Sequence, residues 1–101
     1  MNKRFSEMTH AELRIEMDKM MRELNEAPFP SQREILQARY DMAKAYTLAP
    51  EQFTPGVYRV RGHDKLLHVA YINGVMAWGQ LGEGHNAEEA GFPISIIERI
   101  G

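Results

Sequence analysis

The sequence predicts an α+β fold, in which a helical hairpin over residues 1–50 precedes a small β-barrel over residues 51–101, with one shared core. Thr9 and Ser31 each stand three residues before a glutamate and just before apolar residues at helical spacing, a pattern typical of a capping box. Asn73-Gly74 separates two apolar runs, and this dipeptide favours a β-hairpin. Together these patterns predict two helices followed by several short strands.

The first helix is expected over residues 10–26, because the side chains and backbone N–H groups of Thr9 and Glu12 can bond reciprocally at its start. Its apolar residues recur at helical spacing: Leu13, Met17, Met20, Met21 and Leu24. Pro28 ends it. We interpret the methionines as core residues rather than as an adaptable partner surface, because helical spacing explains them without a further assumption.

The second helix is expected over residues 32–48, with Ser31 and Glu34 as its capping box and Pro50 as its stop. The apolar residues that follow the box are Ile35, Leu36, Ala38, Met42, Ala43 and Tyr46. The connection Ala27-Pro28-Phe29-Pro30 is short, so the two helices should lie antiparallel as a hairpin.

The second half of the chain is expected to form strands separated by turns and one polar loop, residues 82–91. The strands are predicted from apolar runs over residues 57–61, 66–72, 75–81 and 92–97. Both faces of the central hairpin are largely apolar, which does not fit a sheet with one solvent-exposed face. We therefore expect a five-stranded or partly open small barrel from about residue 55 to residue 98.

The register of the central hairpin follows from its turn. A two-residue loop at Asn73-Gly74 pairs Ile72 with Val75. The pairs that follow are Tyr71 with Met76, Val69 with Trp78, and His68 with Gly79. One face is expected to pack on the helical hairpin, with an exposed binding platform as the alternative; its large residues are Tyr71, Met76 and Trp78.

Five segments carry a family resemblance that spans nearly the whole chain: Lys3-Arg4-Phe5-Ser6-Glu7-Met8-Thr9, Glu12-Leu13-Arg14, Pro55-Gly56-Val57-Tyr58-Arg59-Val60-Arg61-Gly62, Ala77-Trp78-Gly79 and Pro93-Ile94-Ser95. In this order they resemble the YfhH-like family of small uncharacterised proteins from Bacillus-type bacteria. The resemblance implies a helical hairpin followed by an SH3-like barrel, and no established activity. The Ala27-Pro28-Phe29-Pro30 connection departs from the glycine-containing turn expected of the family, which affects the hairpin geometry.

Composition and charge exclude several classes of function. The chain has 12 Lys+Arg against 14 Asp+Glu, a net charge of −2, which does not fit a basic nucleic-acid-binding arm. It has no cysteine, which excludes disulfides, thiol catalysis and thiolate zinc sites. No apolar run approaches the ~20 residues that span a bilayer, and residues 1–7 lack the apolar stretch of a signal peptide. A soluble, cytoplasmic protein without membrane contact is expected.

No motif points to a metal, a cofactor or catalysis. The four histidines match no known ligand spacing; they are His10, His63, His68 and His85. No serine stands in a nucleophile elbow, and Gly82-x-Gly84 lacks the lysine of a phosphate loop. We therefore expect that the protein is not an enzyme and that it binds no metal and no cofactor. His68 is expected to be a core or rim histidine with one hydrogen bond.

The favoured function is a non-catalytic protein-interaction or regulatory module with an unknown protein partner. The candidate binding residues are Arg59, Arg61, Lys65, Tyr71 and Trp78. The alternative is a nucleic-acid-binding barrel that uses Arg59, Arg61 and Lys65, with stacking on Tyr71 and Trp78 if these are exposed. Self-association into a homodimer is a further expectation, because the apolar helical stripe could exceed what the barrel covers.

Overall fold

The structure is a computed structural model that describes residues 3–100 and divides the chain into two compact units, Met1–Leu48 and Ala49–Gly101. We call them the helical unit and the β unit. Met1, Asn2 and Gly101 lie outside the described residues. The prediction that residues 1–7 form no signal peptide therefore lies partly outside them as well. The prediction that the two halves share one core stays a prediction.

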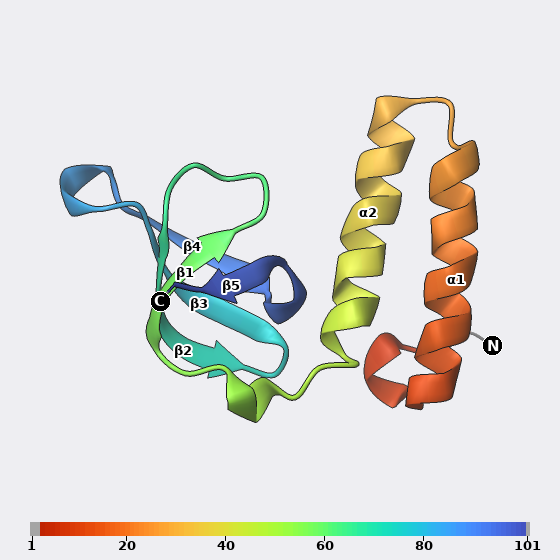
Figure 1. Cartoon of the computed structure of the whole chain (residues 1–101), viewed down its shortest axis with the longest axis horizontal. Coiled ribbons are helices and arrows are strands. Elements are labelled where there is room, and N and C mark those ends of the chain that lie inside the picture. Colours follow the sequence, from red (N-terminus) through yellow and green to blue (C-terminus); the bar gives the residue numbers. More distant parts are fainter. Residues whose placement is uncertain (1–2, 101) are drawn as a thin grey trace. The chain divides into compact units, whose positions relative to one another are not determined.

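The helical unit is an antiparallel hairpin with a short turn before it (Figure 1). A 3-10 turn over Phe5–Glu7 leads into α1 (His10–Glu26), and α2 (Pro30–Ala45) returns beside it. Both predicted helices are therefore confirmed, and the first has its predicted bounds.

The core of the helical unit joins the two helices to the turn that precedes them. Its buried residues are Leu13, Met20 and Ala43, and the side chains packed against them are Phe5, Met8, Met17, Tyr40 and Tyr46. The interpretation of the methionines as core residues is confirmed for Met17 and Met20. It is wrong for Met21, whose side chain is exposed.

The predicted capping box at the start of α1 is confirmed. The Glu12 backbone N–H donates to Thr9 Oγ1, and the Thr9 N–H donates to Glu12 Oε1, each over 3.1 Å. Lys3 Nζ lies 2.9 Å from Glu12 Oε2. The bond from Lys3 and the Thr9 N–H together hold the pKa of Glu12 below its ordinary value of 4.5.

The predicted capping box at the start of α2 is wrong. The N-cap is Phe29, whose side chain cannot accept a hydrogen bond, and Pro30 is the first helical residue. Proline suits this position because its φ is already helical and its missing N–H would have had no partner within the helix. Ser31 therefore lies inside the helix. The helix also ends at Ala45, earlier than predicted.

Replacing Lys3 by alanine is expected to raise the pKa of Glu12 toward 4.5, because its largest stabilising partner is lost. A lowered folded pKa means that the ionised carboxylate stabilises the folded chain above the unfolded pKa, and that this contribution is lost as the pH falls through the folded value. An NMR titration of the Glu12 carboxyl carbon measures the change. Arg4→Ala is the matched control, because Arg4 lies near Glu7 rather than Glu12. An unchanged Glu12 pKa in Lys3→Ala would contradict the assignment.

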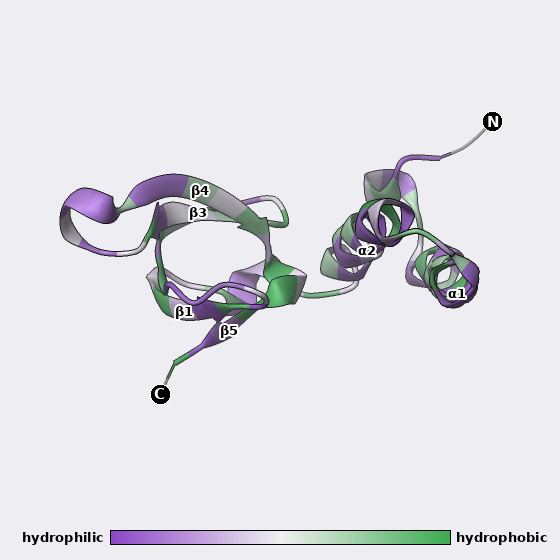
Figure 2. Ribbon diagram, turned by 90° about the horizontal axis from the view of Figure 1, so that it is seen from above, coloured by the Kyte–Doolittle hydropathy of each residue, from purple (hydrophilic) through white to green (hydrophobic). Residues whose placement is uncertain are grey.

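The β unit is one antiparallel sheet of five strands in the order β4-β3-β2-β1-β5. Its strands are β1 (Gly56–Val60), β2 (Leu67–Asn73), β3 (Met76–Leu81), β4 (Glu88–Pro93) and β5 (Ile97–Arg99). The sheet curls so that β3 and β4 lie opposite β1 and β5 (Figure 2). The side chains buried in this unit include Tyr58, Val60, Leu67, Val69, Ala77, Leu81, Ile94 and Ile97.

Among residues 3–100 the sheet is not closed, because β4 and β5 are edge strands that pair only with β3 and β1, so a closed barrel is excluded and the partly open form stays a prediction. Two other predictions about this sheet are corrected. The predicted last strand is split: Pro93 ends β4, a 3-10 turn over Ile94–Ile96 follows, and β5 is three residues long. Part of the predicted polar loop belongs to β4, whose first residues are exposed glutamates.

The predicted hairpin register is wrong at every predicted pair, for two reasons. Asn73 pairs with Met76, so the turn is Gly74-Val75, and a bulge between Val69 and Tyr71 shifts the rest of the pairing. Gly74 has φ +60°, while no non-glycine residue among those described has a positive φ. A type I′ turn needs a positive φ at both central residues, so Asn73 cannot be the first of them here.

Candidate functional site

The bulge in β2 places two of the predicted binding residues together on the outer face of the sheet. Beyond the bulge, Tyr71 lies directly opposite Trp78. The neighbours Ala77 and Gly79 are buried, so the alternation of a strand turns Trp78 away from the core. The Tyr71 side chain is 52% exposed and that of Trp78 is half-buried. We call this pair, with Met76 beside it, the aromatic face.

A glycine on the neighbouring strand sets the position of the Trp78 ring. Gly91 of β4 lies directly opposite Trp78. A Cβ atom on Gly91 would come within 2.7 Å of three indole carbons, so the ring lies flat against the glycine backbone. Glycine in a strand often marks such a close approach. The arrangement restricts the orientation of the indole, whose residue is half-buried.

Acidic residues border the aromatic face. The next row on the same face of the sheet is His68, Gln80 and Glu89, in which Gln80 pairs with each of the other two. Glu83 Oε1 lies 3.5 Å from His68 Nε2, and this buried nitrogen has no hydrogen-bond partner among residues 3–100. The expected single hydrogen bond of His68 is therefore replaced by a longer contact with a carboxylate, which becomes an ion pair only when the imidazole is protonated. The acidic residues of this border come from β4, with Glu89, and from the loop after β3, with Glu83.

The predicted basic residues lie elsewhere. Arg59 and Arg61 are exposed at the end of β1 and line a shallow hollow with Ser95, Ile96 and Glu98. Glu98 lies directly opposite Arg59, so an acidic side chain stands beside this pair as well. The Lys65 side chain lies against Gly82, where an added Cβ would be 3.2 Å from Lys65 Cδ.

The structure thus brings Tyr71 together with Trp78 and Arg59 together with Arg61, but it separates the two pairs. Arg59 lies between buried Tyr58 and Val60, so it points away from the core on β1. Trp78 points away from the core on β3, which is the opposite wall of the curled sheet (Figure 2). A single groove that combines both pairs does not follow from this arrangement.

Sequence reasoning identified the acidic loop with Glu83, Glu88 and Glu89 as opposing nucleic-acid binding, but it missed Gly91 and the position of Glu89 and Glu83 beside the aromatic face. Gly91 was assigned to the predicted polar loop over residues 82–91. Only assigning it to a strand would have placed it opposite Trp78. The glutamates of the border lie in or beside that same segment.

Among residues 3–100, no group of three or more His, Asp or Glu side chains converges as a metal site would require. In the same part of the chain, neither helix is long and apolar enough to cross a membrane.

Comparison with known proteins identifies the relatives of this chain. Residues 3–98 match the model of a family described as a protein of unknown function, DUF1811. An uncharacterized protein, YfhH of Bacillus subtilis (strain 168), is 36% identical over 102 residues, which cover 97% of each chain. The match extends over the sequence of both units.

Proposed function

Since the chain belongs to the DUF1811 family of unknown function, as its resemblance to YfhH-like proteins indicated, we propose from its geometry that it is a non-catalytic, cytoplasmic protein-interaction module. The aromatic face is the contact surface. The single observation that carries this proposal is the exposed Tyr71 beside a Trp78 ring held flat on Gly91.

The energetics of protein interfaces support this assignment. Tyrosine and tryptophan are enriched among the few residues that supply most of the binding energy, because they bury a large area with little loss of side-chain freedom. Trp78 is already held in place by its contact with Gly91, so little further ordering is needed on binding. Tyr71 supplies the exposed area that a partner would cover.

The border of the aromatic face indicates the chemistry of the partner. Glu83 and Glu89 place negative charge beside Tyr71 and Trp78, and a phosphate backbone would be repelled there. The complementary partner is a protein segment with an apolar or aromatic anchor and a flanking lysine or arginine. Such charges raise the rate and specificity of association more than the affinity.

We also propose that the β unit is an SH3-like, partly open barrel. Three features support this: the first and last strands are neighbours in the sheet, a bulge bends β2, and a 3-10 turn separates β4 from β5. Bulges increase the local twist that lets a small sheet fold over on itself. A barrel of this kind presents outer faces and loops to its ligands.

Nucleic-acid binding through Arg59, Arg61 and Lys65 is the second candidate. The observation in its favour is that both arginines are exposed beside one shallow hollow. Glu98 opposite Arg59 and the net charge of −2 oppose it. The aromatic face lies on another wall of the sheet and would not stack bases bound at the arginines.

Tyr71→Ala is expected to abolish capture of a partner protein from a cytoplasmic extract, whereas Asn73→Ala on the same strand should not. Loss of a hot-spot aromatic costs about 2 kcal/mol or more, which is about thirtyfold in affinity. The measurement is quantitative mass spectrometry of the captured proteins, followed by titration with the purified partner. Tyr71 is preferred to Trp78 for this test because its exposed ring contributes less to folding.

Two further conditions separate the candidates. Capture should survive nuclease treatment and the double change Arg59→Ala/Arg61→Ala. Recovery that vanishes under both conditions, together with oligonucleotide binding that weakens steeply with salt, would replace the protein partner with a nucleic acid.

A further inference from the structure

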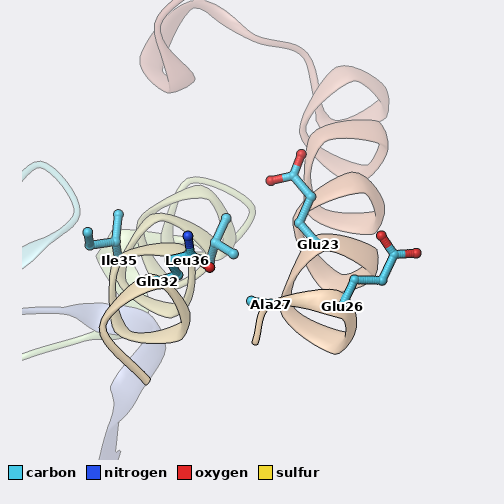
Figure 3. A pocket seen from close by; sticks show the side chains of 6 residues that line it. All are labelled: Glu23, Glu26, Ala27, Gln32, Ile35 and Leu36. Atoms are coloured by element: carbon cyan, nitrogen blue, oxygen red, sulfur yellow. The ribbon is translucent and has the colours of Figure 1, made fainter. Parts of the chain in front are cut away.

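The helical unit has a second exposed surface, which is independent of the aromatic face. Of the hollows along its helices, one lies beside the end of α1 and the start of α2, and another lies beside the start of α1. In Figure 3, Glu23 and Glu26 stand on α1, and Ile35 and Leu36 stand on α2, around the first hollow. Ile15, Lys19 and Glu23 are four residues apart, as are Ile35 and Arg39, so the hollows lie on one side of the hairpin.

We call this side the hairpin groove and define it by six residues: Ile15, Lys19, Glu23, Glu26, Ile35 and Arg39. Ile15 is 66% exposed and Ile35 is 64% exposed. Each stands at a helical position where a charged residue would be equally good for the helix and better for solubility. Two exposed isoleucines on one side of a two-helix hairpin indicate a surface that is covered in the assembled protein.

The charges of the groove are distributed unevenly along it. The hollow around Ile35 is lined by two glutamates and by no base among its lining residues. The hollow around Ile15 contains Lys3, Lys19 and Arg39 with Glu12 and Glu16. Because Lys3 is paired with Glu12, the remaining charge at this end is positive. The groove therefore has an acidic end and a basic end, each with an exposed isoleucine.

We propose that the occupant of the hairpin groove is the same groove of a second copy of this chain. A two-fold axis perpendicular to the helices lays two hairpins antiparallel, so that the acidic end of each copy meets the basic end of the other. An axis parallel to the helices would instead place Glu23 and Glu26 against their own equivalents and is disfavoured by charge. The two isoleucines of each copy are buried between the hairpins in the antiparallel arrangement. This assembly goes beyond the proposed function and does not depend on it.

The size of the groove sets the strength of this dimer. A 17-residue helix is about 25 Å long, and two helices packed about 9 Å apart present a face about 20 Å wide. Two such faces would bury about 1,000 Å², which is at the lower limit for a specific interface. We therefore expect a reversible dimer with a dissociation constant in the micromolar range rather than an obligate one.

Sedimentation equilibrium of the full chain between about 10 μM and about 500 μM tests the proposal, because a weak dimer assembles with concentration. The mass should rise from 11.6 kDa toward twice that value. Ile15→Glu/Ile35→Glu should remain monomeric throughout. Met21→Glu is the matched control, because Met21 is exposed on α1 but does not line the groove, and it should dimerise like the parent. Circular dichroism confirms that each variant keeps its helices.

The relative orientation has its own test, because the chain contains no cysteine. An equimolar mixture of one chain with Lys19→Cys and another with Glu26→Cys should form the mixed disulfide in excess over either same-site disulfide. A same-site excess would overturn the antiparallel arrangement. A mass of 11.6 kDa at the highest concentration, or a dimer unaffected by Ile15→Glu/Ile35→Glu, would overturn the proposal. Partner capture through Tyr71 is unaffected by either result.

Discussion

Replacing Gly79 by alanine is expected to destabilise the β unit severely. Gly79 lies in the middle of β3, opposite Val69 and next to the bulge. An added Cβ would collide with the carbonyl oxygen of His68 and lie 2.8 Å from its carbonyl carbon and 2.9 Å from Val69 Cα. These are backbone atoms of a paired strand, so no side-chain rotation relieves the collision. Overpacking a core commonly costs about 1–3 kcal/mol, and a backbone collision should exceed this range.

Urea unfolding followed by tryptophan fluorescence measures this effect, because Trp78 is the single tryptophan and lies in the β unit. Gly91→Ala is the matched control: the added Cβ would meet the Trp78 ring, a side chain that can move. We expect it to shift the fluorescence and to cost less stability than Gly79→Ala. A Gly79→Ala protein as stable as the parent would show that β2 and β3 do not approach as closely as the structure describes.

Local chemistry accounts for the elements that the sequence predicted well. Thr9 and Glu12 form the first capping box within one turn of chain, and the reciprocal bonds need no distant partner. The second capping box, at Ser31 and Glu34, does not form because the helix already begins at Pro30. The ring of Pro30 fixes φ at a helical value, so the proline determines the helix start and Ser31 lies inside the helix.

The register of the sheet could not be predicted from the sequence, because it depends on the position of the turn at Gly74-Val75 and on one irregular residue in β2. The bulge at Ala70 inserts a residue between Val69 and Tyr71, so that Val69 points into the core and Tyr71 lies on the outer face. The regular register had placed both on one face. A slip of one residue exchanges the faces of a strand, and only packing against the other strands selects where the slip occurs.

The same bulge explains how much of the candidate site could be predicted. Tyr71 and Trp78 were identified by residue type, but their pairing across the strands and the flat contact of Trp78 with Gly91 required the observed register. Arg59 and Arg61 were correctly placed on one strand, while their separation from the aromatic face followed from the curl of the sheet (Figure 2). Whether the aromatic face packs on the helical hairpin stays a prediction.

The largest loss from removing a single side chain is expected for Tyr58→Ala. The ring is 2% exposed, stacks with Phe53 at a centroid distance of 6.3 Å, and lies beneath the Arg99 guanidinium, whose carbon is 5.8 Å from the ring centroid. The Tyr58 hydroxyl donates to Thr54 O over 2.8 Å and accepts from Thr54 N over 3.2 Å. The Tyr58 side chain thus connects the segment that precedes β1, at Phe53 and Thr54, with β1 and β5. Truncating a buried aromatic costs about 3–5 kcal/mol.

A graded series separates the contributions in the same urea assay. Tyr58→Phe keeps the ring but leaves two backbone groups of Thr54 without this partner, which should cost about 1–3 kcal/mol. Arg99→Ala removes an exposed cation–π contact and a bond to Thr54 Oγ1 and should cost about 1 kcal/mol. The expected loss of stability is therefore largest for Tyr58→Ala, smaller for Tyr58→Phe and smallest for Arg99→Ala. If Tyr58→Phe were as stable as the parent, the hydroxyl would contribute nothing net, and burial of the ring alone would hold the entry segment to the sheet.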